Sequence, residues 1–337
     1  MMQYRKQGLR YAGVKSMNIY EEVKDAGSIG IGGHIRPDGD CIGASMGLYL
    51  YLKKVCPQAR VRVMLEEPPA VFSCISGLDE IQTDFASDVE KFDVFIALDT
   101  VKERMGEGEK YFCAAGKKIN IDHHVSNTGC GDVNYIMPEA SSTSELVYEV
   151  IGDKSLLDEE IAKALYIGIV HDTGVFRYSN TSPKTLRAAA ELISYGFDFS
   201  RLIDETFYEK TYVQNQILGR ALLESIIFMD GKCVVSMVDK KTMGFYRADS
   251  HDLDGIVNQL RLTKGVECAI FMYQTDVLKY KVSLRSNGKV DVAKVAMFFG
   301  GGGHVRAAGA DMQGTFHDIV NNLSAQIDAQ LKTEKKA

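Results

Sequence analysis

The sequence predicts an α/β protein with a mostly parallel sheet, joined by a helical connector to a second, smaller α/β domain. Four short runs rich in Val and Ile are separated, in part, by segments of helical periodicity. Such alternation is typical of a parallel sheet covered by helices. The length of 337 residues exceeds one average domain and falls short of three, so two domains are expected.

The expected strands of the first domain span residues 28–34, 60–65, 93–99 and 117–122. Three of them end on a polar residue: His34, Asp99 and Asp122. Ligands of open α/β sheets bind beyond the carboxyl ends of the strands. We therefore expect these side chains to converge at one edge of the sheet.

The expected segments are an N-terminal extension over 1–26, a catalytic domain over 27–204, a helical connector over 205–222 and a second domain over 223–337. Met17 is an alternative start. Residues 140–216 have a helical pattern, with cap candidates at Ser141 to Thr143 and at Asp158. The junction between the domains is not rich in Pro, Gly or Ser, which favours a helix over a flexible tether.

Composition narrows the class of protein. Hydrophobic content of 45% and charged content of 25% are ordinary for a soluble enzyme, and neither a membrane span nor a signal peptide is evident, so a cytoplasmic location is expected. The seven cysteines include no CxxC pair, which argues against a disulfide framework or a structural zinc site. A net charge of −6 argues against binding long duplexes, so any nucleic-acid substrate should be short.

The segment HIRPDGD and the acid of FIALDT are candidate metal ligands. His34 ends a strand, and Asp38 and Asp40 stand two apart, so in an extended turn they could face two ions about 3.5–4 Å apart. Alternatively, Asp40 only caps the following helix. Asp99 ends an apolar run, where an unpaired carboxylate is costly unless it lies between cations or pairs with Lys102.

A second group of candidates lies in NIDHH and VHDTG. Of the adjacent His123 and His124, one can bind metal while the other faces substrate, with Asp122 holding a ring. Asp172 would add a further ligand; helix capping by Gly174 explains that glycine but not the acid. Carboxylates mixed with imidazoles suit a pair of divalent transition ions, and paired ions commonly hydrolyse phosphate esters.

The segment FGGGGHVRAAG is a candidate phosphate-binding loop. Consecutive glycines can leave backbone N–H groups free for an anion, and a cation close by can hold the same anion. The candidate residues are Gly301, Gly302, Gly303, His304 and Arg306. Arg285, at the end of another expected strand, could reach the same phosphate or could be an ordinary surface arginine. No P-loop, dinucleotide GxGxxG or GxSxG motif is present.

The segments HIRPDGD, ALDT, DHH, HDTG and GGGGHVRAAG, in this order and spacing, resemble the DHH phosphoesterase superfamily with its DHH-associated C-terminal domain. The resemblance covers the chain from about Gly27 onward. Within the superfamily the length and two-domain plan are similar to the NrnA type. That type is a stand-alone oligoribonuclease that also acts as a phosphatase on adenosine 3′,5′-bisphosphate.

The resemblance implies two Mn²⁺ ions, with Mg²⁺ or Co²⁺ as substitutes. One ion would be held by His34, Asp38 and Asp99, and the other by Asp40, Asp99, His123 and Asp172. Asp99, Asp122, His123 and His124 would form the catalytic group, in which Asp122 orients a ring and His124 touches the phosphate. A water that the two ions activate would release nucleoside 5′-monophosphates without a covalent intermediate. The role of His171 stays open.

Other functions remain open at this stage. A phosphodiesterase for linear or cyclic dinucleotides such as pApA or c-di-AMP would use the same site, and only the shape of the pocket would discriminate. A non-catalytic nucleotide-binding module would be expected to have lost some ligands, and none is missing. The expected partners are short single-stranded RNA or dinucleotides and adenosine 3′,5′-bisphosphate, without a membrane; a homodimer is compatible with the sequence.

Overall fold

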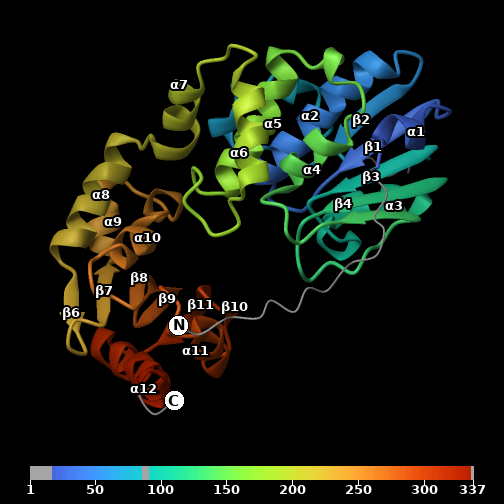
Figure 1. Ribbon diagram of the computed structural model, residues 1–337. Helices are drawn as coiled ribbons and strands as arrows, with labels where there is room; N and C mark the ends of the chain where they lie inside the picture. Colours follow the sequence, from blue (N-terminus) through green and yellow to red (C-terminus); the bar gives the residue numbers. More distant parts are fainter. Residues whose placement is uncertain (1–16, 86–90, 335–337) are drawn as a thin grey trace, which may run out of the picture. The chain divides into compact units, whose positions relative to one another are not determined.

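The computed structural model describes residues 17–85 and 91–334. Most of the expected N-terminal extension lies outside the described residues, and its remainder carries the short helix α1 (Ile19–Val23). The chain divides into two compact units, Met1–Glu209 and Lys210–Ala337, each described by itself (Figure 1). None of the described helices is long and apolar enough to cross a bilayer.

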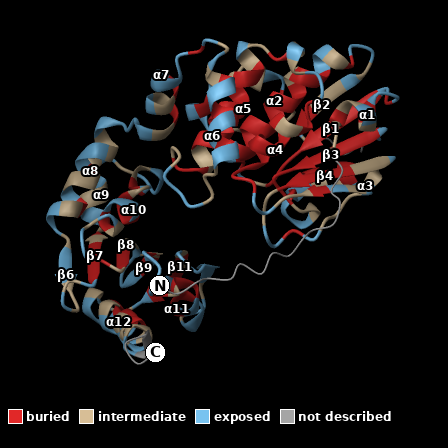
Figure 2. Ribbon diagram, viewed as in Figure 1, coloured by how far each residue is buried: buried red, intermediate tan, exposed pale blue. Residues whose placement is uncertain are grey.

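The first unit is built on a five-stranded sheet in the order β2-β1-β3-β4-β5, and every pair of neighbours is parallel. The strands are β1 (Ser28–Gly32), β2 (Arg60–Met64), β3 (Val94–Leu98), β4 (Lys117–Asp122) and β5 (Val133–Ile136). All residues of β1 and β3 are buried, as the red central strands of Figure 2 show. The predicted parallel sheet is confirmed, and β5 adds a short strand whose sequence, VNYI, has a weak apolar signal.

Among the described residues, three helices lie against this sheet: α2 (Gly39–Val55), α3 (Glu109–Ala114) and α4 (Thr143–Val150) (Figure 1). Helix α5 (Glu159–Asp172) packs on α2 and α4, and α6 (Pro183–Ile193) and α7 (Phe199–Ile203) pack on α5. Short helical turns are η1 (Ala70–Phe72), η2 (Leu78–Glu80), η3 (Lys102–Arg104), η4 (Gly106–Gly108), η5 (Lys154–Leu156) and the π-helical η6 (Asp204–Tyr208). Ser142 and Asp158 accept hydrogen bonds from the first turns of α4 and α5, which confirms these two predicted caps.

The most extensive helix contact among the described residues of the first unit joins α2 to α5. Gly39, Gly43 and Gly47 recur every four residues on α2 and form one face of that helix. A Cβ on Gly43 would lie 2.5 Å from the carbonyl oxygen of Ala164, and Gly39 lies against the ring of His171. The missing side chains let α5 approach closely, and this brings the end of α5 beside the start of α2.

The second unit holds a six-stranded mixed sheet in the order β10-β11-β9-β8-β7-β6, in which only β7 and β8 pair in parallel. Its strands are β6 (Ile226–Phe228), β7 (Cys233–Val238), β8 (Cys268–Asp276), β9 (Lys279–Ser286), β10 (Gly302–His304) and β11 (Ala307–Gln313). Its helices are α8 (Tyr212–Leu223), α9 (Lys240–Tyr246), η7 (His251–Leu253), α10 (Ile256–Arg261), α11 (Val292–Phe298) and α12 (Phe316–Glu334). The predicted smaller α/β domain is confirmed.

The central strands β7 and β8 are covered on both faces of this sheet. Alternate residues of β8 serve two cores: Ile270 packs in the cluster that includes residues of α11 and α12, whereas Phe271 packs in the cluster that includes residues of α8 and α10. Because side chains alternate across a strand, the consecutive apolar residues of the first part of β8 require cover on both sides.

The glycine contact between α2 and α5 predicts an asymmetric response to alanine. Gly43→Ala should lower the free energy of unfolding by at least about 1–3 kcal/mol, because the new methyl group meets backbone that cannot rotate away. The matched control is Gly219→Ala in α8, where a Cβ meets nothing within 4 Å. That change should stabilise by about 0.5–1 kcal/mol. Chemical denaturation of both variants checks this, and equal stability would contradict the role given to Gly43.

Candidate functional site

The ends of three strands and two helices bring the predicted ligands together. His34, Asp99 and His123 follow β1, β3 and β4, while Asp38 and Asp40 begin α2 and Asp172 ends α5. Parallel strands present their carboxyl ends at one edge of a sheet, which explains the convergence of the first three. The contact between α2 and α5 adds the other three.

Asp99 lies at the centre of the cluster. Its Oδ2 is 3.5 Å from His34 Nε2, and its Oδ1 is 3.5 Å from both His123 Nε2 and His124 Nδ1. The residue has a left-handed backbone, with φ of 58°, at the turn that leaves β3. The two oxygens of one carboxylate thus face two separate groups of side chains.

The groups on the two sides of Asp99 each contain three close ligand atoms. Beside an overlapping group of Asp99, Asp122, His123 and His124, two groups remain: His34, Asp38 and Asp99 form one, and Asp40, His123 and Asp172 form the other. Within each group the ligand atoms lie within 4.8 Å of one another. His123 Nε2 is 3.5 Å from Asp172 Oδ2 and 3.9 Å from Asp40 Oδ2. Either group could hold a metal ion.

The ring of His34 is oriented for such a role. Its Nδ1 lies 2.9 Å from the carbonyl oxygen of Ile35, so that a proton on Nδ1 leaves Nε2 facing Asp38 and Asp99. A ligating histidine commonly uses its second ring nitrogen in this way. The side chain is buried, which limits its other orientations.

The start of α4 supports Asp40. The backbone N–H groups of Thr143 and Ser144 donate to the Asp40 carboxylate at 2.6 and 2.9 Å. These groups belong to the first turn of α4, which has no partner for them within the helix. The hydroxyl of Thr143 also donates to Asp99 Oδ1 at 3.0 Å, so α4 positions both acids.

The charges of the cluster suit divalent cations. Asp40 and Asp99 are each 2% exposed. Burial, followed by the charges of Asp99 and Asp172, raises the pKa of Asp40, and burial raises the pKa of Asp172 to about 6. Burial alone would lower the pKa of His34, but the neighbouring carboxylates of Asp38 and Asp99 raise it to about 10. Protons and metal ions compete for these ligand atoms, and this set of carboxylates and imidazoles fits divalent transition ions.

Asp122 holds the ring of His124. Its Oδ1 accepts the backbone N–H of His124 at 3.0 Å and lies 2.7 Å from His124 Nδ1, while its Oδ2 accepts Asn127 Nδ2 at 2.5 Å. Asn127 in turn donates to Asn120 Oδ1 at 3.0 Å. This buried chain occupies Asp122 and leaves Nε2 of the partly exposed His124 for another partner.

Some residues of the site were missed at the sequence level. Thr143 was considered only as a helix cap, although the SST segment before ELVYEV does mark the helix start that binds Asp40. Asn127 follows the DHH segment at close range, but a polar loop residue of this kind has no pattern that reveals a buried hydrogen bond. Asn180 donates to the Asp172 backbone carbonyl at 3.1 Å, and no sequence pattern indicates this contact either.

His171 is packed rather than directed at the ligands. Thr206 Oγ1 donates to the carbonyl oxygen of Leu202 at 2.8 Å, so the 3.1 Å contact with His171 is donated by the ring Nε2–H. The rings of Phe72 and Phe207 lie edge-on at 5.0 and 5.3 Å. Burial lowers the pKa of His171 to about 4. A neutral ring thus fastens the end of α5 to the π-helical turn η6.

The glycine loop of the second unit differs from expectation. The N–H of Gly301 donates to the carbonyl oxygen of Ala296 at 2.9 Å and that of Gly300 to Met297 at 3.0 Å, because these residues end α11. The expectation that the glycines leave their N–H groups free is therefore wrong for Gly301. Gly303 has φ of 144°, and a Cβ at this position would lie 2.5 Å from the carbonyl oxygen of Ala307. The turn therefore requires a glycine here.

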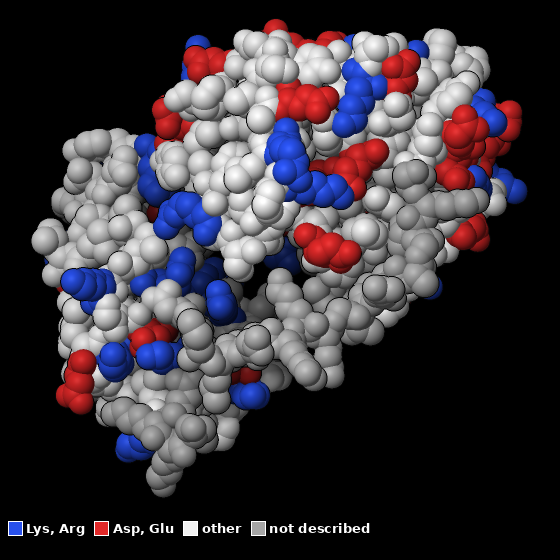
Figure 3. Space-filling model, viewed as in Figure 1, with Lys and Arg blue, Asp and Glu red and all other residues white. Residues whose placement is uncertain are grey.

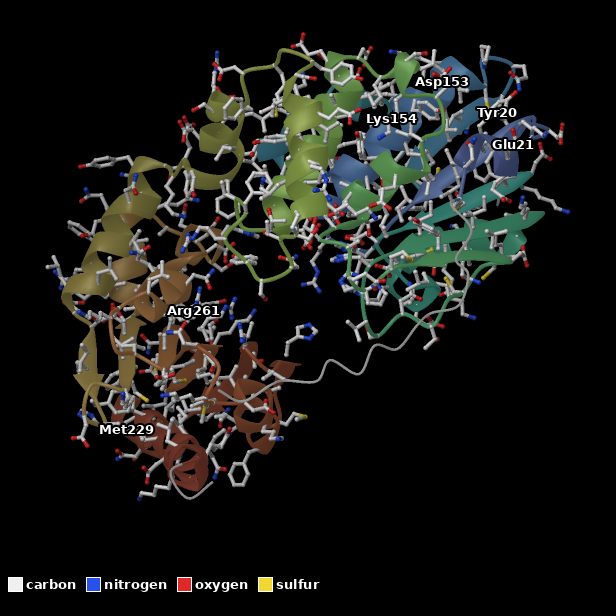
Figure 4. The ribbon with its side chains drawn as sticks, viewed as in Figure 1. Tyr20, Glu21, Asp153, Lys154, Met229 and Arg261 are labelled. Atoms are coloured by element: carbon white, nitrogen blue, oxygen red, sulfur yellow. The ribbon has the colours of Figure 1, made fainter. Side chains whose placement is uncertain are left out.

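The basic candidates of the second unit share one end of its sheet. His304 pairs with Ala307, and Ala307 pairs with Arg285, across β10, β11 and β9. Arg306 stands between β10 and β11 and is exposed. Arg285 Nε donates to Asn258 of α10 at 3.0 Å, and Arg261, labelled in Figure 4, ends the same helix. The visible face of this unit carries several Lys and Arg side chains (Figure 3).

The first unit is a parallel α/β domain with two groups of acids and imidazoles around Asp99, and the second unit is a mixed-sheet domain. Both units correspond to known protein domains. Residues 28–169 match the DHH family, N-terminal domain, and residues 230–333 match the DHHA1 domain. The chain belongs to the DHH family, and the resemblance of its motifs is confirmed.

Several known proteins are similar over most of the chain. The bifunctional oligoribonuclease and PAP phosphatase NrnA of Thermus thermophilus is 33% identical over 307 residues, 89% of each chain. Its Bacillus subtilis namesake is 28% identical over 83% of this chain and 87% of its own. The crystal structure of an exopolyphosphatase-related protein from Bacteroides fragilis has a TM-score of 0.82 at 27% identity, and covers 92% of this chain and 94% of that one.

The central position of Asp99 predicts the effect of removing its charge. Asp99→Asn keeps the side-chain shape and tolerates the left-handed backbone, but should lower turnover by at least about 10³-fold, roughly 4 kcal/mol of transition-state stabilisation. Bound metal, measured by elemental analysis, should also fall. The control is Asp25→Ala, which removes an exposed carboxylate. A folded Asp99→Asn protein with near-normal turnover would exclude a shared metal ligand at this position.

Proposed function

We propose that this chain is a metal-dependent phosphoesterase that hydrolyses short RNA oligonucleotides to nucleoside 5′-monophosphates and dephosphorylates adenosine 3′,5′-bisphosphate. The observation that carries the proposal is the pair of ligand groups that meet at Asp99. Paired divalent ions are a common means of cleaving phosphate esters. The names of the Thermus and Bacillus relatives, which join an oligoribonuclease to a PAP phosphatase, support both substrates.

The ligand groups support two ions, for which we propose Mn²⁺ with Mg²⁺ or Co²⁺ as substitutes. His34, Asp38 and Asp99 would hold the first ion, and Asp40, Asp99, His123 and Asp172 the second. When bound, such ions supply a nucleophilic water near neutral pH and positive charge at the phosphoryl oxygens. The mixture of imidazole and carboxylate favours Mn²⁺ over Ca²⁺, which takes oxygen ligands.

The chain's own groups complete the site. Asp122 accepts a hydrogen bond from the Nδ1–H of His124, whether the ring is neutral or charged. In both states Nε2 is left for the substrate phosphate. Arg306 and His304 of the second unit, with Arg285 beside them in the sheet, would bind a further phosphate of the substrate. No side chain needs to form a covalent bond with phosphorus.

A substrate panel tests the function. The protein, supplied with Mn²⁺, would be given 5′-labelled RNA oligomers, adenosine 3′,5′-bisphosphate, pApA, cyclic dinucleotides and pyrophosphate. We expect hydrolysis of dinucleotides and short oligomers and release of AMP from the bisphosphate. Activity only on pApA or cyclic dinucleotides would replace the proposal with a signalling phosphodiesterase, and no activity on any phosphate ester would refute it.

Arg306 separates substrate binding from metal binding. Arg306→Ala should raise KM for nucleotide substrates by about 10-fold or more, as expected for a charge-assisted contact with phosphate, and leave bound metal unchanged. The control is Arg187→Ala, which removes an exposed arginine of α6 in the first unit. Loss of manganese from the Arg306→Ala protein, measured by elemental analysis, would contradict this division of labour.

The charge distribution predicts a preference for short substrates. A nuclease for long strands uses an extended basic track, whereas this chain has a net charge of −6 and few candidate phosphate-binding residues. The ratio kcat/KM should be highest for RNA of two to about five nucleotides and at least about tenfold lower at about 24 nucleotides. Equal efficiency on 5-mers and 24-mers would indicate a processive exonuclease instead.

A further inference from the structure

The loop that follows α5 has an unusual backbone. Gly174, Val175 and Phe176 are three consecutive residues in the left-handed region, with φ of 55°, 57° and 60°. Valine and phenylalanine rarely adopt this conformation, because their Cβ atoms crowd the backbone. Such residues persist where the surrounding structure holds them, and they are concentrated at functional sites.

Thr173 and the core hold this loop in place. The carbonyl oxygen of the buried Thr173 accepts the N–H groups of both Arg177 and Tyr178 at 2.9 Å, and its hydroxyl accepts the N–H of Phe176 at 3.0 Å. The ring of Phe176 packs 6.2 Å from that of Tyr166 in the core. The loop is therefore a fixed structure, and the position of Tyr178 is set by it.

The loop begins and ends at a proposed metal ligand. It leaves α5 at Asp172, and Asn180 returns to donate to the backbone carbonyls of Asp172 at 3.1 Å and Ser141 at 2.9 Å. Between these two points the ring of Tyr178 lies over Gly174, where a Cβ would collide with it. A planar aromatic side chain, 51% exposed, is thus held within a closed loop that is anchored on the cluster.

A second exposed apolar residue follows a member of the same cluster in the chain. Val125, which is 82% exposed, follows His124 directly in the chain. Single exposed apolar residues are ordinary on protein surfaces. The exposure of Tyr178 differs, because its loop has a strained backbone and is anchored at Asp172. The acids and imidazoles of the cluster at Asp172 are suited to phosphate chemistry.

We propose that Tyr178 forms a nucleobase-binding subsite of the first unit, in which a base of the substrate stacks on the exposed face of its ring. This inference rests on the proposed function and adds the means by which a nucleotide is preferred to other phosphate esters. Every base has a π-face, so stacking on an aromatic ring binds nucleotides without selecting a sequence.

Matched substrates test the subsite. A diribonucleotide would be compared with two analogues that lack either the 5′ or the 3′ base, using wild-type protein, Tyr178→Ala, Tyr178→Phe and the control Phe199→Ala. Phe199 is an aromatic residue of α7 with 43% exposure, outside the loop. Tyr178→Ala should lower kcat/KM for the complete dinucleotide by about tenfold and leave one abasic analogue unaffected, whereas Tyr178→Phe should stay close to wild type.

A binding measurement keeps the two proposals separate. The chain contains no tryptophan, so Tyr178→Trp introduces a single fluorescent reporter that can itself stack. Its emission should be quenched by a dinucleotide but not by inorganic phosphate. If the wild-type protein hydrolyses no oligonucleotide, the proposed function fails while this quenching still decides the subsite. The subsite is overturned if Tyr178→Ala lowers kcat/KM equally for all three dinucleotides or not at all, or if the dinucleotide causes no quenching.

Discussion

The repulsion among three neighbouring carboxylates is the constraint on which this structure depends. Asp40, Asp99 and Asp172 lie around one imidazole, that of His123, at distances between 3.5 and 3.9 Å. Backbone N–H groups at the start of α4 offset part of the charge on Asp40, and the remaining charge requires protons or cations. Metal ions that bind only the folded arrangement would stabilise it, so folding and metal binding are expected to be coupled in this domain.

The acids of the cluster come from elements that are distant in sequence, so only the packing of those elements brings their carboxylates together. Strand ends alone would bring together His34, Asp99 and His123. Asp172 joins them because the glycine face of α2 allows α5 to lie against it. The same contact leaves room for His171, whose uncharged ring fills the space beside Gly39 and ties α5 to η6. The contact between α2 and α5 therefore contributes both to the stability of the domain and to the placement of Asp172. A methyl group on Gly43 is expected to disturb both.

The sequence was sufficient for features that follow from periodicity and from strand ends. Apolar runs that stop at His34 and Asp99 predicted both the parallel sheet and the edge where its polar residues gather. What the sequence could not reveal were contacts made by residues without a periodic pattern. Asn127 reaches Asp122 through a loop, and the N–H of Gly301 is used to end α11, although a glycine run by itself suggests free N–H groups. Such assignments depend on which neighbouring element claims a hydrogen bond, and that is decided only in three dimensions.

A cluster of carboxylates and imidazoles determines the kind of reaction but discriminates little among phosphate esters, since each presents similar oxygens to a metal. Selectivity has to come from groups that contact the rest of the substrate. In the function and subsite proposed above, charged side chains such as Arg306 would recognise additional phosphates, and an aromatic surface such as that of Tyr178 would recognise a base. A nucleotide with two phosphates and a short oligonucleotide share these features, whereas pyrophosphate has no base. A ligand cluster that acts on phosphate, with separate groups for a second phosphate and for a base, would therefore account for the proposed activity on both a bisphosphate and short RNA.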